Sequence, residues 1–411
     1  MLRNDPSHPS AVAIHRDNTQ LILFLSARVS SVMAYQMLSV AVGWHIYALT
    51  GSPFYLGLVG LAQFFPLFLL ALIVGHVADR YERRTVGRLC QLFESAGVAV
   101  LAAGNLAGWL NAHLILGIVL LIGGARAFEA PTMQAFLPNL VSRDRFPKAV
   151  AWATSSSQTA VIVGPALGGF LYAANPSVAY LAIVVLFAGA SLVTSRIKGG
   201  RVKKESSTAD LRSVFAGITF IRANPAILGA ISLDLFAVLL GGATALLPVY
   251  ARDILCVGPW GLGLLRSAPA VGALAMSISL ARHPLQSRIG RTMFLAVIVF
   301  GMATILFALS TSLIVSLISL VILGAADVTS VVIRQFLVQI RTPDNMRGRV
   351  AAVNSVFIGT SNQLGEFESG LTAAWFGVVP AVLIGGIGSI IIALGWMRLF
   401  PELLHVDKAQ D

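Results

Sequence analysis

The sequence predicts an all-α integral membrane protein with twelve transmembrane helices in two parallel-repeat halves of six helices. Composition is the first of three observations behind this prediction. Of the 411 residues, 56% are hydrophobic and 11% are charged, whereas soluble globular proteins carry about 25% charged residues. One spanning helix takes about 20 mostly apolar residues, so about 230 apolar side chains supply eleven or twelve spans. This composition excludes a soluble enzyme with a single membrane anchor.

The second observation is that short polar breaks divide the apolar sequence into twelve runs. These predicted spans cover residues 21–48, 54–76, 87–109, 113–138, 149–173, 177–195, 225–250, 260–281, 292–310, 312–340, 349–376 and 378–400. We expect an N-terminal six-helix half over residues 1–195 and a C-terminal half over 225–411. Between them, residues 196–224 form a predicted cytoplasmic linker with an amphipathic segment.

The third observation is the distribution of basic residues. With both termini in the cytoplasm, 24 Lys and Arg residues fall in inner segments, and only Arg252 falls in an outer loop. This bias is the positive-inside pattern, and it predicts a multi-pass protein of the bacterial inner membrane with both termini cytoplasmic. The net charge of +11 then faces anionic lipid. Nucleic acid is therefore not an expected partner.

The two halves also repeat in sequence. Residues 124–155 align without gaps on residues 324–355, at a constant offset of 200. A second similarity joins Ser52-Pro53-Phe54-Tyr55-Leu56-Gly57-Leu58 to Gly258-Pro259-Trp260-Gly261-Leu262-Gly263-Leu264. Six spans, a basic linker and six similar spans indicate a parallel duplication. In transporters built this way, the substrate path lies near the bilayer midplane between the repeats.

The turn after the second predicted span carries a ten-residue motif, G-x-x-x-D-R-x-x-R-R, at Gly75, Asp79, Arg80, Arg83 and Arg84. Glycine permits close helix approach, and the arginines favour a cytoplasmic loop. The motif resembles the signature loop of the major facilitator superfamily. That resemblance implies that Asp79 packs against the start of the eleventh helix and stabilises an outward-open state. The alternative is a basic loop that only sets topology.

The fifth predicted span contains Gly164, Pro165, Gly168 and Gly169. A proline flanked by glycines bends a helix and allows a neighbouring helix to approach closely. The pattern resembles the G-P-x-x-G element of exporters in the superfamily, which implies export. Ala151 and Ala160 stand where the full pattern has glycines. Ordinary helix packing is the alternative interpretation.

Ten charged residues lie inside the predicted spans, where each costs at least about 2.5–3.5 kcal/mol on insertion scales. They are Arg28, Glu94, Arg126, Glu129, Asp234, Arg266, Asp327, Arg334, Glu366 and Glu368. Six lie on the first, fourth, seventh and tenth spans, which the superfamily resemblance implies line the cavity. These six candidates for proton coupling or substrate contact are Arg28, Arg126, Glu129, Asp234, Asp327 and Arg334.

Helical spacing suggests partners for several of these charges. Arg126 and Glu129 are spaced i, i+3, and Asp327 and Arg334 are spaced i, i+7, so each pair shares a helix face. The same-face arginine ranks Asp327 ahead of Asp234 as the acid that exchanges protons, although a structural ion pair is the alternative for both. Arg126 also occupies the place of the fourth-span arginine of superfamily proton antiporters. Arg266 is a candidate partner for Glu366 or Glu368, which lie two residues apart.

Two polar clusters lie on the fifth and eleventh spans. They comprise Ser155, Ser156, Ser157, Gln158 and Thr159, and Asn354, Ser361, Asn362 and Gln363. We expect them to hydrogen-bond across the interface between the halves, because small polar residues commonly mediate helix contacts. Lining of a transport pathway is the alternative.

The pattern as a whole resembles the exporter branch of the superfamily. It implies export of a small organic molecule (a siderophore, drug or metabolite) by alternating access, with proton antiport, in a monomer without metal or cofactor. Import or proton symport of a metabolite is the alternative. No G-x-x-x-x-G-K-[ST] motif indicates an ATP-driven pump, and no H-E-x-x-H or G-x-S-x-G motif indicates an intramembrane enzyme. A channel suits two duplicated halves poorly.

Overall fold

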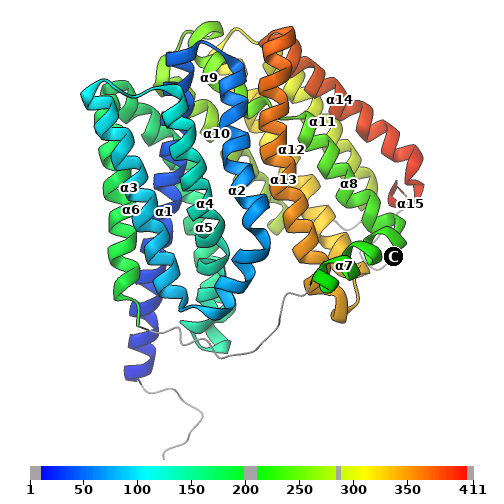
Figure 1. Cartoon of the computed structure of the whole chain (residues 1–411). Helices are drawn as coiled ribbons and strands as arrows, with labels where there is room; N and C mark the ends of the chain where they lie inside the picture. The colour runs from blue at the N-terminus through cyan, green and yellow to red at the C-terminus, as the bar shows by residue number, and fades with distance from the viewer. Residues whose placement is uncertain (1–10, 199–210, 284–287, 405–411) are drawn as a thin grey trace, which may run out of the picture.

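The computed structural model describes residues 11–198, 211–283 and 288–404, and within these ranges every regular element is helical (Figure 1). The N-terminal half contains α1 (Ala11–Thr50), α2 (Pro53–Arg80), α3 (Arg83–Ala107), α4 (Ala112–Phe136), α5 (Phe146–Ala174) and α6 (Pro176–Arg196). The C-terminal half contains α8 (Pro225–Leu240), α10 (Gly258–Arg282), α11 (Ile289–Leu309), α12 (Leu313–Arg341), α13 (Asp344–Phe376) and α14 (Val378–Leu399). These helices confirm the predicted fold of twelve spans in two halves.

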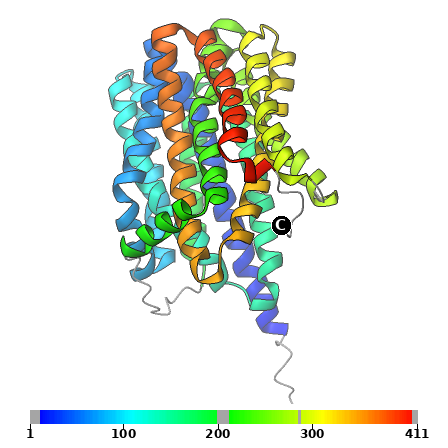
Figure 2. The same ribbon diagram turned by 90° about the vertical axis from the view of Figure 1, so that its right-hand side faces the viewer.

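Shorter helices connect the spans. They are η1 (Leu137–Asn139) and η2 (Arg143–Arg145) before α5, α7 (Leu211–Ala223) before α8, η3 (Ala243–Leu246), α9 (Leu247–Val249) and η4 (Tyr250–Ile254) after α8, and α15 (Pro401–Leu404) after α14. We call the end where α1 begins, α6 ends and α7 lies the linker end, and the opposite end the far end (Figures 1 and 2). At the linker end, α7 packs against α13. The division of the chain at residues 195 and 224 stays a prediction.

Ten helical stretches in the described ranges are long and apolar enough to span a membrane. Helices α5 and α13 fall outside this set because polar residues interrupt their apolar surface, including the serine run at 155–157 and the segment from Ser361 to Glu368. Many large apolar side chains on the outside of the bundle are exposed, among them Val185, Leu106 and Ile314. Such an apolar outer surface suits contact with lipid chains.

The seventh span differs from the continuous apolar run that the sequence predicts over 225–250. Helix α8 ends at Leu240, and Gly241 and Gly242 separate it from η3, α9 and the π-helical segment η4. A helix interior disfavours glycine by about 1 kcal/mol, and here Gly242 lies directly against the backbone of Gly365 on α13. The break therefore combines weak helix propensity with a close approach that only glycine allows.

Two glycine crossings join the halves near the far end. A side chain at Gly57 of α2 would lie 2.9 Å from the carbonyl oxygen of Phe367 on α13. A side chain at Gly169 of α5 would lie 2.5 Å from the carbonyl oxygen of Pro259 on α10, beside Gly263. Gly57 and Gly263 occupy matching positions in the sequence repeat. The duplication therefore appears in space as two related contacts, one on each side of the bundle.

Towards the linker end the halves are apart. The face of α5 that touches α10 at Gly169 continues, at helical spacing, through Thr159 and Ser155 to Ala151. All three of these residues are exposed. The same helix face is thus covered by the other half at the far end and uncovered near the linker end. This conformation is closed at the far end.

Candidate functional site

A central pocket of about 210 Å³ lies between the two halves, next to the glycine crossings on the side of the linker end. It takes side chains from α1, α2, α5, η3, α10 and α13, so both halves build it. Its polar lining residues are Tyr35, Gln36, Ser39, Gln63, Thr244, Arg266, Gln363 and Glu366. A concave site with a few convergent polar groups is typical of small-molecule binding.

The broken seventh span brings backbone and small side chains to this pocket. Thr244 and Ala245 of η3 line it directly after the break at Gly241 and Gly242. Transporters commonly place discontinuous helices at the substrate site, because irregular backbone at membrane depth is tolerated where it lines a cavity. The break therefore allows residues of η3 to line the pocket.

Arg266 and Glu366 bring opposite charges into the central pocket without forming an ion pair within 4 Å in the described chain. The Nε of Arg266 and the Oε1 of Gln363 are buried and have no hydrogen-bond partner among the described residues. Buried polar groups are usually satisfied, so these atoms are available to a ligand. Glu368 instead accepts a hydrogen bond from Thr372 at 2.8 Å. Of the two glutamates, only Glu366 shares the pocket with Arg266.

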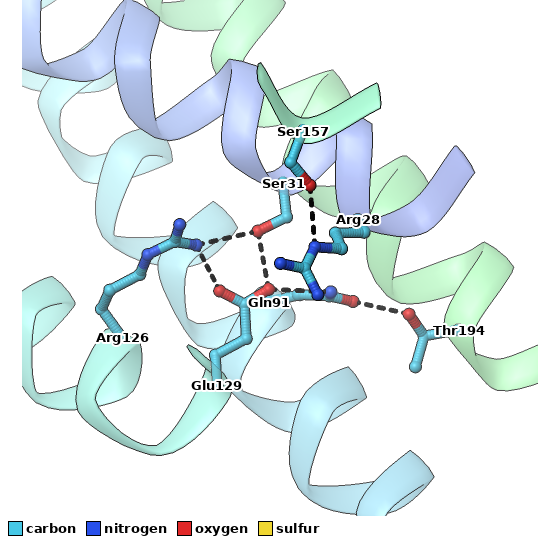
Figure 3. A network of polar contacts seen from close by, with 7 residues as sticks. All are labelled: Arg28, Ser31, Gln91, Arg126, Glu129, Ser157 and Thr194. Atoms are coloured by element: carbon cyan, nitrogen blue, oxygen red, sulfur yellow. Dashed lines mark hydrogen bonds and ion pairs between the residues drawn. The ribbon is translucent and has the colours of Figure 1, made fainter. Parts of the chain in front are cut away.

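The N-terminal half holds a buried polar network around Glu129 (Figure 3). Glu129 accepts hydrogen bonds from Ser31 at 2.6 Å and from Gln91 at 2.9 Å, and it forms an ion pair with Arg126. Gln91 in turn accepts a hydrogen bond from Thr194 at 2.9 Å. The predicted pairing of Arg126 with Glu129 is confirmed. Charge-assisted bonds of this kind are among the stronger hydrogen bonds in proteins.

Arg28 lies beside this network, but its hydrogen-bond partner is a residue outside it. Its Nε donates a hydrogen bond to the hydroxyl of Ser157 on α5 at 2.8 Å (Figure 3). Ser157 belongs to the polar cluster that the sequence places between the halves, yet its partner lies in its own half. No side-chain hydrogen bond of the two clusters crosses between the halves in the described ranges. The interface interpretation of the clusters is therefore wrong for these residues.

Tyr35 connects the network to the central pocket. The guanidinium carbon of Arg126 lies 4.6 Å from the centre of the Tyr35 ring, a cation–π contact. The Tyr35 hydroxyl donates a hydrogen bond to Gln63 Oε1 at 2.5 Å. Tyr35 and Gln63 both line the pocket. Tyr35 thus contacts both a polar residue of the pocket and the arginine of the ion pair.

The C-terminal half holds a second buried ion pair. Arg334 of α12 lies 2.5 Å from Asp234 of α8, and the Arg334 side chain is 2% exposed. The prediction that Arg334 partners Asp327 on its own helix is wrong, because a residue of the adjacent helix comes closer. Asp327 and Ser330 instead share a small cavity with Asp234. Asp327 lies next to the pair without belonging to it.

A third polar contact closes the far end. The Tyr47 hydroxyl of α1 donates a hydrogen bond to Asp253 of η4, and Arg252 donates to the Tyr47 carbonyl oxygen at 3.0 Å. The Arg252 guanidinium also lies 5.4 Å from the Tyr47 ring centre. Arg252, the single basic residue of the predicted outer loops, thus joins the two halves. We call these three residues the far-end contact.

The signature-loop residues divide between the end of α2 and the start of α3. Gly75 and Asp79 lie in the last turns of α2, but their side chains fall outside the described part of the structure. The implied contact of Asp79 with the eleventh span stays a prediction. Arg80 is exposed. Arg83 donates a hydrogen bond to the Ala135 carbonyl oxygen at 2.5 Å, and Arg84 lies 3.2 Å from Glu82.

The glycine–proline element of α5 has two sides. Side chains at Gly164 and Gly168 would lie 2.8 Å from Gln36 and from Met37 of α1, respectively. Gly169 faces α10, and Pro165 lines the central pocket. The element therefore lets α5 approach a helix of its own half and a helix of the other half at the level of the pocket. Close helix packing, the alternative interpretation of this element, is thus present in the geometry, and the export that the resemblance implies stays a prediction.

Sequence reasoning missed several pocket and network residues because they are uncharged. Tyr35, Gln63, Gln91 and Thr194 are polar residues inside long apolar helices. A search for all polar residues at membrane depth, and not only for charged ones, would have found them. The Gly241–Gly242 pair followed by Pro248 was the corresponding signal for the broken span. The two cysteines, Cys90 and Cys256, are free.

A helical bundle of two repeated halves around a polar pocket defines a transporter of the major facilitator superfamily. The chain belongs to its transmembrane secretion effector family, MFS_3, whose family model matches residues 10–410. It is 25% identical over 389 residues to the enterobactin exporter EntS of Escherichia coli (strain K12), covering 92% of this chain and 91% of the exporter. The corresponding exporter of Salmonella typhimurium (strain LT2) is 26% identical over 384 residues, with the same coverage.

Solved structures show the same fold. A bacterial homologue of the human lysosomal transporter Spinster, in an inward-facing and unoccupied conformation, has a TM-score of 0.74 at 13% identity, covering 94% of this chain and 98% of that chain. The nucleoside transporter NupG has a TM-score of 0.71 at 14% identity, covering 93% and 99%. The relatives and the solved structures are transporters and not enzymes. The predicted membership in the superfamily, with a resemblance to its exporters, is confirmed.

Proposed function

We propose that this protein exports a small organic molecule across the bacterial inner membrane by alternating access, in exchange for protons, and that it acts as a monomer. The observation that carries the proposal is the central pocket, which both halves build and in which Arg266 and Glu366 form no ion pair with any residue that the structure describes. The transporter fold and the similarity to enterobactin exporters support export. The name of those relatives makes a siderophore one candidate substrate, beside drugs and other metabolites.

The distribution of basic residues supports an orientation with the linker end and both termini in the cytoplasm. The described conformation is then open towards the cytoplasm and closed towards the outside by the glycine crossings and the far-end contact. A cytoplasmic substrate enters between α5 and α10, passing the exposed Thr159 and Ser155, and reaches Arg266 and Glu366. Release requires the halves to separate at Tyr47 and Asp253 and to approach each other at the linker end.

Proton exchange has candidate groups in both halves. Antiport needs a carboxyl group that binds a proton in one conformation and releases it in the other. An arginine that approaches or leaves a buried carboxylate changes the energy of its ionised form. Asp234 beside Arg334 and Glu129 beside Arg126 both have such an arginine, and Asp327 lies close to the first pair. The Tyr35 contact gives the pocket a physical connection to Arg126.

The test compares metabolites inside and outside cells of a deletion strain, the same strain with the wild-type gene, and one with Arg266→Ala. We expect one compound to be retained by the deletion strain and released on complementation, but not by the Arg266→Ala variant at equal abundance. That compound, loaded into proteoliposomes, should leave against its gradient when an inward proton gradient is imposed. Depletion of a compound inside the deletion strain, with no compound retained, would instead establish import.

A further inference from the structure

Glu94 of α3 is a buried acid to which neither the ion pairs nor the central pocket assigns a role. Its side chain is fully buried, with 0% exposure. Neither carboxyl oxygen has a hydrogen-bond partner among the described residues. Gln91, one turn earlier on the same helix, directs its amide to Glu129 and not to Glu94. Glu94 is therefore a fully enclosed carboxyl group to which no described residue donates a hydrogen bond.

The groups around Glu94 come from four helices. Glu129 and Arg126 of α4, Cys90 one turn earlier on α3, and Tyr35 of α1 are all within electrostatic range of its carboxyl group. Helix α6 packs along α3, and its Ser191 and Thr194 hydroxyls bond to residues of α3 that precede Glu94. These hydroxyls donate to the Arg88 carbonyl oxygen and to Gln91, respectively. Neither of these hydroxyls is bound to Glu94.

Glu129, in contrast to Glu94, has hydrogen-bond donors on its carboxylate. Glu129 receives hydrogen bonds from Ser31, Gln91 and Arg126, so its negative charge is stabilised. A buried carboxylate without a donor is far less favourable than a buried neutral carboxylic acid. Both acids are within electrostatic range of Arg126, and in this conformation the arginine is paired with Glu129.

We propose that Glu94 is a proton-binding site of the N-terminal half, protonated in this conformation while Arg126 is bound to Glu129. The exchange balances if the arginine changes partner. When Arg126 turns to Glu94, the O–H bond of Glu94 breaks, and its proton passes to the carboxylate of Glu129. The acids together keep one proton and one negative charge, and the proton has moved from an enclosed site to one beside Ser31 of α1. A role of Glu94 in transport rests on the proton exchange that we propose as part of the function. The protonation of Glu94 in this conformation does not rest on it.

The experiment is infrared spectroscopy of the purified full-length protein in lipid nanodiscs, in H2O and in D2O at neutral pH. We compare the wild type with Glu94→Gln and with the control Glu402→Gln, which changes an exposed glutamate. We expect the deuterium-sensitive C=O stretch of a protonated carboxyl group to lose intensity in Glu94→Gln and to keep it in Glu402→Gln. Equal intensity in the wild type and Glu94→Gln would overturn the proposal.

Thermal unfolding of the same samples gives a second readout. A glutamine has the shape of a neutral glutamic acid, so Glu94→Gln should unfold within a few degrees of the wild type. Failure of Glu94→Gln to fold would also overturn the proposal, because it would mean that the ionised form is required. Neither the infrared spectrum nor the unfolding temperature depends on a substrate. The failure of the protein to transport any compound would therefore count against the proposed function and not against the protonation of Glu94.

Discussion

Arg334 of α12 forms its ion pair with Asp234 of α8, and not with Asp327, which lies two turns earlier on its own helix. The N-terminal half has a comparable arrangement, in which Arg126 binds Glu129 while the Glu94 carboxyl has no hydrogen-bond partner among the described residues. Each of these two buried sets therefore contains one paired arginine, one paired acid and one further acid. The two sets do not occupy matching positions of the sequence repeat, so the similarity lies in the chemistry.

The pair of Asp234 and Arg334 should be important for stability. Removing one partner of a buried pair leaves an unpaired charge, which typically destabilises a protein by about 3–5 kcal/mol. We expect Asp234→Asn and Arg334→Met each to lower the thermal unfolding temperature clearly. The double variant should recover most of the loss, because neither charge then remains. Additive losses in the double variant would contradict the pairing.

Asp327 should matter more for coupling than for folding. Because it lies beside the ion pair without joining it, Asp327→Asn should leave the unfolding temperature near that of the wild type. We expect the variant to lose uphill efflux driven by a pH gradient and to retain downhill exchange of the substrate in proteoliposomes. Undiminished pH-driven accumulation would remove Asp327 from the mechanism. Asp234 or Glu129 would then be the next acid to test.

Arg126 and Glu129 offer a second pair for a double-mutant cycle. Glu129→Gln leaves Arg126 without its carboxylate, and Arg126→Met leaves the buried Glu129 with only Ser31 and Gln91. Each single variant should be less stable than the double variant, by the same reasoning as for the other pair. Because Arg126 also contacts Tyr35, Tyr35→Leu serves as a control that removes the aromatic contact and leaves the ion pair. Strictly additive losses of stability would count against coupling of the two charges.

The orientation can be tested with a native cysteine. Cys256 is exposed at the far end, between η4 and α10, whereas Cys90 lies within α3. A membrane-impermeant thiol reagent should label Cys256 from outside in intact spheroplasts. Cys256→Ser, which leaves only Cys90, should abolish this labelling. Labelling of Cys256 only after the membrane is broken would place the far end in the cytoplasm.

The α5–α10 crossing should tolerate no added side chain. Gly169→Val would place a branched side chain against the Pro259 carbonyl oxygen, where even a Cβ atom lies only 2.5 Å away. We expect the variant to fold but to lose efflux, because the far end no longer closes. The matched control is Gly189→Val on α6, where a Cβ atom meets nothing within 4 Å. Equal loss of efflux in both variants would point to a general effect of valine.

Local sequence patterns predicted the fold and the local part of the site. Hydropathy and charge located twelve spans, the repeat matched Gly57 with Gly263, and helical spacing found the Arg126–Glu129 pair. Contacts between distant segments were not accessible in the same way. The partner of Arg334 is 100 residues away in sequence, and the meeting of Arg266 with Glu366 depends on how α10 and α13 pack. Single uncharged groups such as Gln91 and Tyr35 were not predicted, because they belong neither to the charged residues nor to the two polar clusters that stand out in the sequence.

The position of the two glycine crossings determines how far the linker end moves when the halves rotate. From Gly263, helix α10 runs on to Arg282 at the linker end, about 19 residues or about 28 Å away. If the halves turn about a line through the crossings, each degree of rotation displaces that distant end by about 0.5 Å. The same degree scarcely changes the distance between the two backbones at the pivot. A small rotation of the halves can therefore open a wide entrance at the linker end while the backbones at the crossings stay in contact.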